Sequence, residues 1–501
     1  MFGAGISLLD RSLEKMDAKN LLIIMSDQHS NKMLGCYGHP MVRTPNLDAL
    51  ARRGTLFTDA YTCCPVCIPA RAAFATGKYI HQIAFWDNAD PYDGSVASWH
   101  HYLRDQGHRV VSIGKLHFRS AEDDNGFSEE IIPMHVIDKK GDLMGLVRED
   151  LPVRGAAWKM AGMAGAGESS YTHYDREIAA RAQVWLHEEA PKYRDKPWVL
   201  FVSFVTPHYP LTAPPEYYYA YLNDPDLPLP KAYCEDARPD HPFVAEYRAS
   251  FNFDTYFNDE RKVRQAIAGY FGLCTFMDEQ VGKVLDALAD SGLAADTRVA
   301  YTSDHGDNLG ARGLWGKTTL YEETANIPLI LAGPVIPEDR VIRTPVSHVD
   351  FLPFILEAVG EATDEFRNAG CPGHSLFELA AGGEPERTVL CEYHAMGSTT
   401  GAFMIRWGRY KYVHYVAFRP QLFDLESDPE ELHDLAQDPA FAGVIADCEA
   451  KVRDICDPEE VDRRAKARQA DLLEAAGGRE AVIARGDLGF TPAPGSNPEF
   501  E

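Results

Sequence analysis

Several apolar runs in the N-terminal part of the chain end abruptly in polar or charged side chains. A strand that is buried on both faces of a parallel sheet has this continuous apolar pattern, whereas a half-exposed strand alternates. We predict such strands at residues 20–28, 109–117, 198–205, 297–307 and 327–333. Because ligands gather outside the carboxyl ends of strands in open α/β sheets, the polar residues after these runs are the candidates for chemistry.

Helical periodicity separates the predicted strands. Apolar residues recur at helical spacing over 46–57, 176–190, 260–288 and 347–360, and the third of these segments is the longest. Segment 123–172, rich in Gly, Met and Asp, shows little periodicity and is predicted as a long loop or a small excursion over the site. Segment 214–242, rich in Tyr and Pro, is predicted as a loop at the pocket rim. The order of elements indicates an α/β fold with a large, mostly parallel central sheet flanked by helices.

The pattern changes from about residue 364. Alternating or aromatic stretches at 388–393, 403–407 and 410–416 predict an antiparallel sheet, and 441–476 is helical and highly charged. The last stretch, with Pro492, Pro494 and Pro498, is predicted to lack a fold of its own and to suit contact with a neighbouring subunit, so we expect a homodimer or homotetramer. The predicted divisions are an N-terminal extension (1–18), an α/β domain (19–363), a C-terminal α+β subdomain (364–476) and a tail (477–501).

Composition excludes some partners. The chain has 501 residues and a net charge of −26, which argues against binding to nucleic acid or anionic membranes but not against an anionic substrate held by local cations. Residues 1–20 lack the continuous apolar run of a signal peptide, and no apolar run approaches the ~20 residues of a membrane span. Ten cysteines at irregular spacing indicate mostly reduced thiols, so we expect a cytoplasmic protein.

The densest chemical signal is the stretch Cys63-Cys64-Pro65-Val66-Cys67-Ile68-Pro69-Ala70-Arg71. Cys67 to Arg71 has the form C-x-P-x-R, and small apolar residues continue into a predicted helix that ends near Gly77. A nucleophile just before a helix lies near unpaired N–H groups and the positive dipole end, which favours an anionic ester. The planar, permanently charged Arg71 suits holding the nucleophile or a substrate oxygen. The alternatives are buried thiols, or a zinc site that lacks a second Cys/His pair.

The polar residues at the other strand ends suit anion binding, proton transfer and metal binding. Lys115 and His117 stand two apart, so in an extended segment both point to one face, where a cation and an imidazole would bind an anion and move a proton. The alternative for Asp27, taken alone, is a helix or turn cap. Trp86 is expected to pack rather than to line a pocket. The other candidates are Gln28, Asn88, His208, Asp304, His305 and Lys317.

In this order the motifs resemble those of type I, formylglycine-dependent sulfatases of the alkaline phosphatase superfamily, over about residues 19–435. The matching elements are C-x-P-x-R at 67–71, G-K-x-H at 114–117, T-P-H at 206–208, S-D-H-G at 303–306 and the D-L-E-S-D-P-E segment at 424–430. The resemblance implies that a maturation enzyme oxidises Cys67 to formylglycine. It also implies a divalent cation held by Asp27, Asp304, His305 and residue 67, with Gln28 adjacent. Oxygen ligands favour Ca²⁺, Mg²⁺ or Mn²⁺, and His305 tilts the choice toward Mn²⁺.

The mechanism that the resemblance implies is covalent. One hydroxyl of hydrated formylglycine at position 67 attacks sulfur while the metal and nearby cations neutralise the oxygens. His208, with Lys317, protonates the departing alkoxide, and His117 then removes a proton from the second hydroxyl so that sulfate leaves. The implied cations are Arg71, Lys115 and Lys317, and the implied substrate-binding residues are Asn88, Lys115, His208 and Lys317.

Two residues depart from the common sulfatase pattern, and they leave the substrate open. Ala70 stands where many sulfatases have Ser, and Gln28 where many have Asp; with the Asp304-His305 pair these are also similar to phosphonate monoester hydrolases. Segments 86–89, 114–118 and 124–127 look closer to choline-sulfatase-like enzymes. We therefore expect hydrolysis of a small sulfate monoester, with phosphonate monoester or phosphodiester hydrolysis as the alternative. A binding module with an unmodified Cys67 is the alternative of another class.

Overall fold

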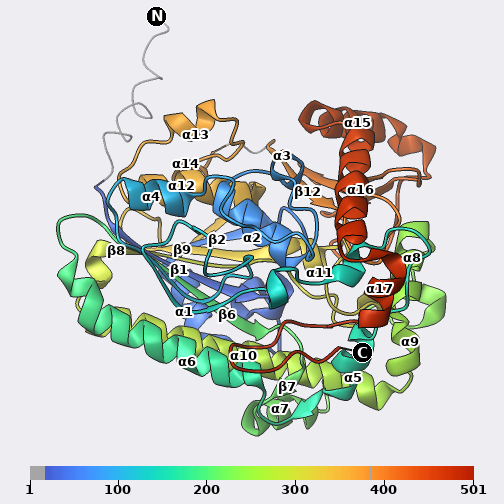
Figure 1. The fold of residues 1–501 in the computed structure, drawn as a ribbon, viewed down its shortest axis with the longest axis horizontal. Helices are drawn as coiled ribbons and strands as arrows, with labels where there is room; N and C mark the ends of the chain where they lie inside the picture. Colours follow the sequence, from blue (N-terminus) through green and yellow to red (C-terminus); the bar gives the residue numbers. More distant parts are fainter. Residues whose placement is uncertain (1–16, 384–385, 501) are drawn as a thin grey trace, which may run out of the picture.

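The computed structural model describes residues 17–383 and 386–500 (Figure 1). A nine-stranded sheet with helices on both faces forms the larger part, and a separate four-stranded antiparallel sheet lies in the C-terminal part. The predicted fold class is confirmed. The predicted extension 1–18 lies outside the described residues except for its end, and among the described helices none is long and apolar enough to cross a membrane.

The central sheet is mostly parallel. Its strand order is β10-β2-β9-β8-β1-β6-β3-β4, with β11 also paired to β2. Only β9 runs antiparallel to both of its neighbours. The strands are β1 (Asn20–Asp27), β2 (Gly54–Tyr61), β3 (Val110–Lys115), β4 (Glu129–Met134), β6 (Val199–Pro207), β8 (Thr297–Ser303), β9 (Asn326–Ala332), β10 (Arg340–Ile342) and β11 (Val346–Ser347).

Both faces of the sheet are covered, which explains the continuous apolar runs. Side chains alternate across a strand, so Leu21 and Ile23 of β1 pack on one face and Leu22 and Ile24 on the other. Figure 1 shows α6 and α10 together along one side of the sheet and α2, α4 and α12 along the opposite side. The helices that pack on the sheet, with α1 included, are α1 (Pro45–Arg52), α2 (Cys67–Thr76), α4 (Trp99–Asp105), α6 (Ser170–Val184), α10 (Glu260–Asp290) and α12 (Phe351–Ala358).

The C-terminal part forms its own sheet in the order β12-β13-β14-β15. Helix α15 packs on β13 and β14 through buried Cys448 and Val452, and α16 stands beside it (Figure 1). The elements are β12 (Thr388–Tyr393), β13 (Ala402–Trp407), β14 (Tyr410–Tyr415), β15 (Gln421–Asp424), α15 (Ala442–Ile455) and α16 (Pro458–Ala475).

A buried ion cluster joins the two sheets. Lys411 of β14 is fully buried, and its Nζ lies 2.9 Å from Oε1 of Glu322 and 2.7 Å from Oε1 of Glu431. Glu322 begins α11 (Glu322–Ala325), directly before β9 of the central sheet. Burial raises the pKa of Glu322, but Lys411 outweighs this and the net pKa is lowered. The cluster therefore fixes the C-terminal sheet against the catalytic part.

Some predicted elements are wrong in extent. The helix predicted over 46–57 ends at Arg52, because Gly54 begins β2, whose residues pair with β9. The predicted loops contain regular elements: β4, α5 (Ala156–Gly162) and the short strand β5 (Gly165–Ala166) lie in 123–172, and α7 (Pro215–Leu222) lies in 214–242. The segment 441–476, predicted to be helical, forms two helices, because Pro458 restarts the chain as the first residue of α16.

The prediction that residues 477–501 lack a fold is also wrong. Gly478–Arg485 form α17, and the chain then runs toward α10 and back, packed on its own molecule (Figure 1). Asp487, Leu488 and Ala493 are buried. The proline content hid this packing, which depends on partners far away in the sequence.

Candidate functional site

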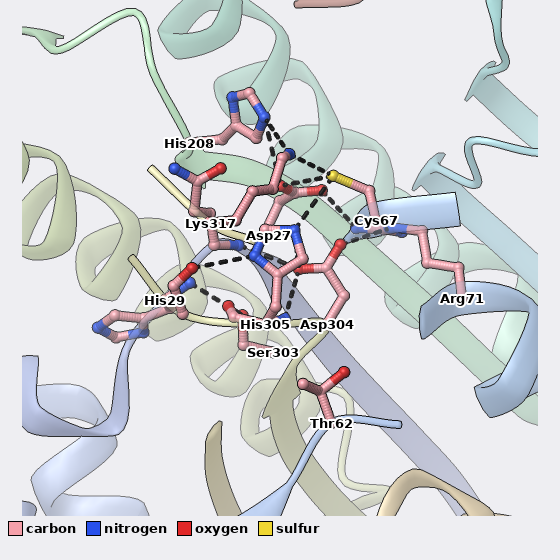
Figure 2. Close-up of polar contacts among 12 residues, drawn as sticks. Asp27, His29, Thr62, Cys67, Arg71, His208, Ser303, Asp304, His305 and Lys317 are labelled. Carbon is pink, nitrogen blue, oxygen red and sulfur yellow. Dashed lines mark hydrogen bonds and ion pairs between the residues drawn. The ribbon is translucent and has the colours of Figure 1, made fainter. Parts of the chain in front are cut away.

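The predicted strand-end residues meet at one edge of the central sheet. Strands β8, β1, β6 and β3 are consecutive neighbours and parallel, so their carboxyl ends lie side by side. Figure 2 shows the side chains that converge there on the N-terminus of α2. They come from β1 (Asp27), the segment after β6 (His208), the segments after β8 (Asp304, His305, Lys317) and α2 (Cys67, Arg71).

Cys67 is the first residue of α2, as the sequence predicts. Its Sγ lies 2.7 Å from Nζ of Lys317 and 3.2 Å from Nε2 of His305. All ten residues of α2 are buried, so the helix N-terminus points into an enclosed site. The helix ends at Gly77, whose φ of 65° is left-handed, the conformation that a glycine cap adopts without a steric cost. The Cys67 sulfur occupies the place where the oxygens of a formylglycine side chain would lie.

Arg71 holds two carboxylates rather than the nucleophile. Its Nη2 lies 3.0 Å from Oδ2 of Asp27 and its Nε 2.9 Å from Oδ2 of Asp304. Its Nη1 donates to the carbonyl oxygen of Lys115 at 2.8 Å and to Oγ of Ser203 at 3.0 Å. A planar fork with several donors suits this task, and the side chain is buried. Arg71 therefore fixes the ends of β1, β3, β6 and β8 relative to one another.

Four buried residues could hold a metal ion. Ligand atoms of Asp27, Cys67, Asp304 and His305 all lie within 4.8 Å of one another. Nδ1 of His305 donates to the carbonyl oxygen of Gly306 at 3.0 Å, which leaves Nε2 with the free lone pair that a metal needs. Among the described residues, the buried Oε1 of Gln28 has no hydrogen-bond partner, while its Nε2 donates to Asp307. Two carboxylates, an imidazole and a spare amide oxygen fit a divalent cation.

The charges around Asp27 favour its ionised form. Burial raises its pKa, but Lys115, His208, Arg71 and Lys317 together hold the pKa well below the ordinary value. The closest of these contacts is the 2.7 Å ion pair between Nζ of Lys115 and Oδ2 of Asp27. Burial and Asp27 raise the pKa of the second carboxyl, Asp304, to about 6, so a bound cation would keep both carboxyls ionised.

Lys317 connects Cys67 to His208. Its Nζ lies 2.9 Å from Nε2 of His208, whose Nδ1 donates to the carbonyl oxygen of Tyr209 at 2.6 Å. Burial lowers the pKa of Lys317, but Cys67 and Asp27 outweigh it and raise the pKa. Burial and Lys317 hold the pKa of His208 well below its ordinary value. The pair is therefore a charged lysine that donates to a neutral imidazole.

His117 lies on the other side of Lys115. Its φ of 59° is left-handed, so the segment is not extended there, yet both side chains line one small cavity. Burial and Lys115 hold the pKa of His117 well below its ordinary value. Its Nε2 lies 2.9 Å from Oγ1 of Thr491, and its Nδ1 has no partner among the described residues.

The cavity, about 40 Å³, is lined by five of the predicted residues: Asn88, Lys115, His117, His208 and Lys317. Asn88 also accepts a hydrogen bond from the backbone N–H of Ile68 at 3.0 Å, which ties it to the start of α2. The remaining wall includes Asp142, Arg154, Tyr209 and the segment 488–491. No periodicity or motif in the sequence pointed to these residues.

The alternative interpretations of nearby residues are settled by their contacts. Trp86 is buried and packs edge-on against His394 with ring centroids 5.2 Å apart, which confirms the packing prediction. Of the three clustered cysteines only Cys67 belongs to the possible metal group. Burial raises the pKa of Cys63 to about 12 and that of Cys64 well above the ordinary value, so both are neutral buried thiols.

A doubly covered α/β sheet with carboxylates, imidazoles and lysines gathered around a helix-start nucleophile defines a hydrolytic, metal-assisted type of site. The family described as Sulfatase matches residues 19–361, and the family described as N-sulphoglucosamine sulphohydrolase, C-terminal, matches residues 310–457. The chain belongs to the sulfatase family, as its motifs predict.

Named relatives and solved structures agree with this assignment. The chain is 33% identical over 433 residues to a choline-sulfatase of Rhizobium meliloti, covering 84% of this chain and 83% of the relative. It is 27% identical over 465 residues to arylsulfatase K of Bos taurus, covering 88% and 82%. The structure of the phosphonate monoester hydrolase of Agrobacterium radiobacter superposes with a TM-score of 0.68 at 23% identity, covering 90% of this chain and 96% of that one. The last comparison bears on the fold alone.

Proposed function

We propose that the protein hydrolyses sulfate monoesters to an alcohol and sulfate, with residue 67 as the nucleophile. The observation that carries the proposal is the position of Cys67 at the first turn of α2, within 3.2 Å of His305 and 2.7 Å of Lys317. Membership of the sulfatase family supports the reaction class. The buried cations match the charge of the substrate, because three of them (Arg71, Lys115 and Lys317) face two carboxylates.

The cofactors follow from the same residues. Asp27, Asp304 and His305 would hold one divalent cation together with residue 67, and the spare oxygen of Gln28 would complete the set. The cation would supply charge that neutralises ester oxygens and lowers the pKa of a bound hydroxyl. The mixed oxygen and imidazole donors favour Mn²⁺ or Ca²⁺, with Mg²⁺ also compatible. A maturation enzyme that converts Cys67 to formylglycine is the implied partner.

The residues of the chain perform five tasks in this reaction. Arg71 keeps the two carboxylates in place, so the site needs little rearrangement when the substrate binds. Lys115 and Lys317 bind the sulfate oxygens, and Asn88 holds the helix start. Lys317 donates its proton toward His208, and this pair delivers a proton to the leaving alkoxide. His117, a neutral base with one unpartnered nitrogen, accepts the proton whose removal releases sulfate.

A second candidate is hydrolysis of phosphonate monoesters or phosphodiesters at the same site. Gln28 supports it, because many sulfatases have Asp at this position and the neutral amide is similar to phosphonate monoester hydrolases. Such esters carry the same single charge as a sulfate monoester, so the charge of the pocket accepts both. A choline-sulfatase-like specificity is the third possibility, supported by the relative of 33% identity.

The test compares two cysteine variants in protein produced with the maturation enzyme. Cys67→Ala should abolish hydrolysis of 4-nitrophenyl sulfate, while Cys63→Ala, which removes a neighbouring buried thiol, should keep it. Equal activity of both variants would refute the assignment of the nucleophile. Parallel assays with a phenylphosphonate monoester decide between the first two candidates: a higher kcat/KM for the phosphonate would make the second one correct.

The remaining predictions stay proposals. We propose the boundaries 19–363 for the catalytic domain and 364–476 for the C-terminal subdomain, with the buried cluster around Lys411 joining them. A homodimer or homotetramer and a cytoplasmic location are likewise proposed. Size-exclusion chromatography with light scattering tests the first, and cell fractionation tests the second.

A further inference from the structure

The chain after α17 lies against the active-site cavity instead of projecting from the molecule. Leu488, Gly489, Phe490 and Thr491 line the same cavity as Lys115, His117, His208 and Lys317. Thr491 and Leu488 are buried. This wall segment (residues 487–491) has no role in the function proposed above, although it touches the groups that perform it.

A buried ion pair anchors the wall segment. Nη2 of Arg154 lies 2.7 Å from Oδ1 of Asp487 and 2.6 Å from Oδ2 of Asp142. Oδ2 of Asp487 also accepts the backbone N–H of Ala156, at the start of α5, at 3.1 Å. Arg154 is 3% exposed and Asp487 is 1% exposed, so water competes little for these bonds. The segment is therefore built into the fold.

Three hydrogen bonds join the wall segment to His117 and to two tyrosines of the site. Oγ1 of Thr491 lies 2.9 Å from Nε2 of His117, and the carbonyl oxygen of Thr491 accepts the Tyr171 hydroxyl at 2.5 Å. The carbonyl oxygen of Gly489 accepts the Tyr209 hydroxyl at 2.6 Å, and the Tyr209 ring stacks on His208 with centroids 4.3 Å apart. The wall segment thus contacts His117 directly and reaches His208 through Tyr209.

The cavity left by this wall is small. Its volume is about 40 Å³, and the wall segment supplies four of its lining residues, Leu488 to Thr491. The Phe490 ring lines the cavity and packs edge-on against Tyr171 and Tyr209, with centroids 5.5 and 6.0 Å apart. A leaving alcohol has to fit beside this ring.

We propose that the wall segment completes the active site: Phe490 limits the leaving alcohol to a compact one, and Thr491 is a positioning residue that orients His117. The inference rests on the proposed function and adds a substrate class, the sulfate esters of small alcohols. In this view the ring at 490 sets the size limit. The hydroxyl at 491 holds Nε2 of His117, so that Nδ1, the unpartnered nitrogen, faces the reaction.

The size limit is tested by comparing a methyl-sized alkyl sulfate with a naphthyl sulfate. Phe490→Ala should enlarge the pocket and raise kcat/KM for the bulky ester, relative to kcat/KM for the small ester, by about tenfold. Changes of this order are typical when a hydrophobic pocket discriminates by size. Phe490→Leu, which keeps an apolar side chain if alanine unfolds the segment, should raise it less. Phe500→Ala is the matched control, because Phe500 lies over Arg485, outside the cavity. An unchanged ratio in both Phe490 variants would overturn the size limit.

The positioning role is tested at Thr491. Thr491→Val keeps the shape but removes the hydroxyl, so kcat for the small ester should fall about tenfold while KM changes little. Thr491→Ser should restore kcat, and Thr344→Val, a half-buried threonine outside the cavity, should leave it unchanged. Equal kcat in wild type and Thr491→Val would overturn the role, as would equal loss in the Ser and Val variants. Absence of any sulfatase activity in the wild type would instead contradict the proposed function.

Discussion

Replacing Lys411 with methionine tests how the C-terminal sheet is held against the catalytic part. The substitution keeps an apolar side chain of similar length but removes the positive charge of the lysine. It leaves Glu322 and Glu431 buried, with carboxylate oxygens that lay 2.9 and 2.7 Å from Nζ. Leaving buried carboxylates uncompensated is the costly way to break an ion pair.

The magnitude follows from the burial of the cluster. Lys411 and Glu431 are fully enclosed and Glu322 is nearly so, so we expect a loss of about 3–5 kcal/mol in the free energy of unfolding. A chain of 501 residues that unfolds as one unit has an unfolding entropy of about 1 kcal/mol/K, so the melting temperature should fall by about 3–5 °C.

Differential scanning calorimetry measures this shift. Lys283→Met is the matched control, because Lys283 forms an exposed ion pair with Glu279 at helical spacing and should lower the melting temperature by less than about 1 °C. Adding Glu322→Gln and Glu431→Gln to Lys411→Met should recover part of the loss, since the buried charges are then gone. A melting temperature for Lys411→Met equal to that of the wild type would refute the reasoning.

Two further predictions concern the site and its support. Arg71→Lys should lower kcat by at least about tenfold and weaken binding of the divalent cation in equilibrium dialysis. The reason is that one ammonium group cannot bond both Asp27 and Asp304 as the guanidinium group does. An unchanged metal affinity would argue against this role of Arg71. Glu392 is buried, and although burial raises its pKa, His81 and His394 outweigh this and lower it. The pKa of Glu392 in the folded state therefore lies below the ordinary value of 4.5. Ionised Glu392 stabilises the folded state above pH 4.5, and this stabilisation is lost as the pH falls through the folded-state pKa. The gap in melting temperature between wild type and Glu392→Gln should narrow on acidification below pH 4.5, and a gap that widens would contradict the assignment.

The sequence predicts most of the sheet because both of its faces are buried. In β1 every residue after Asn20 is buried, so the apolar run and its polar end are visible without any structure. The same reasoning places Asp27, His208 and Asp304 at strand ends. These residues meet because β8, β1, β6 and β3 are neighbours in the sheet. The order of strands in a sheet cannot be predicted from the sequence of any single strand.

Long-range contacts are what the sequence leaves hidden. The sequence suggested that Arg71 holds the nucleophile or a substrate oxygen. In the structure its guanidinium group instead bonds the carboxylates of Asp27 and Asp304. The stretch 477–501, which contains the wall segment, looked unstructured because it is rich in Pro and Gly, whereas Asp487 pairs with Arg154, 333 positions away. Gly54 likewise belongs to a strand because β9 pairs with it, although the preceding periodicity is helical. Tertiary partners override local preference in all three cases.

The most direct test of the account is the mass of the tryptic peptide from Gly54 to Arg71, which carries residue 67. Protein purified from its native host should yield a peptide lighter than the cysteine form by about the mass of one water molecule. That peptide should react with a reductive aldehyde label, and the modification should map to position 67 rather than 63 or 64. A peptide of the unmodified mass, with three free thiols and no label, from native protein that hydrolyses sulfate esters would contradict the formylglycine mechanism.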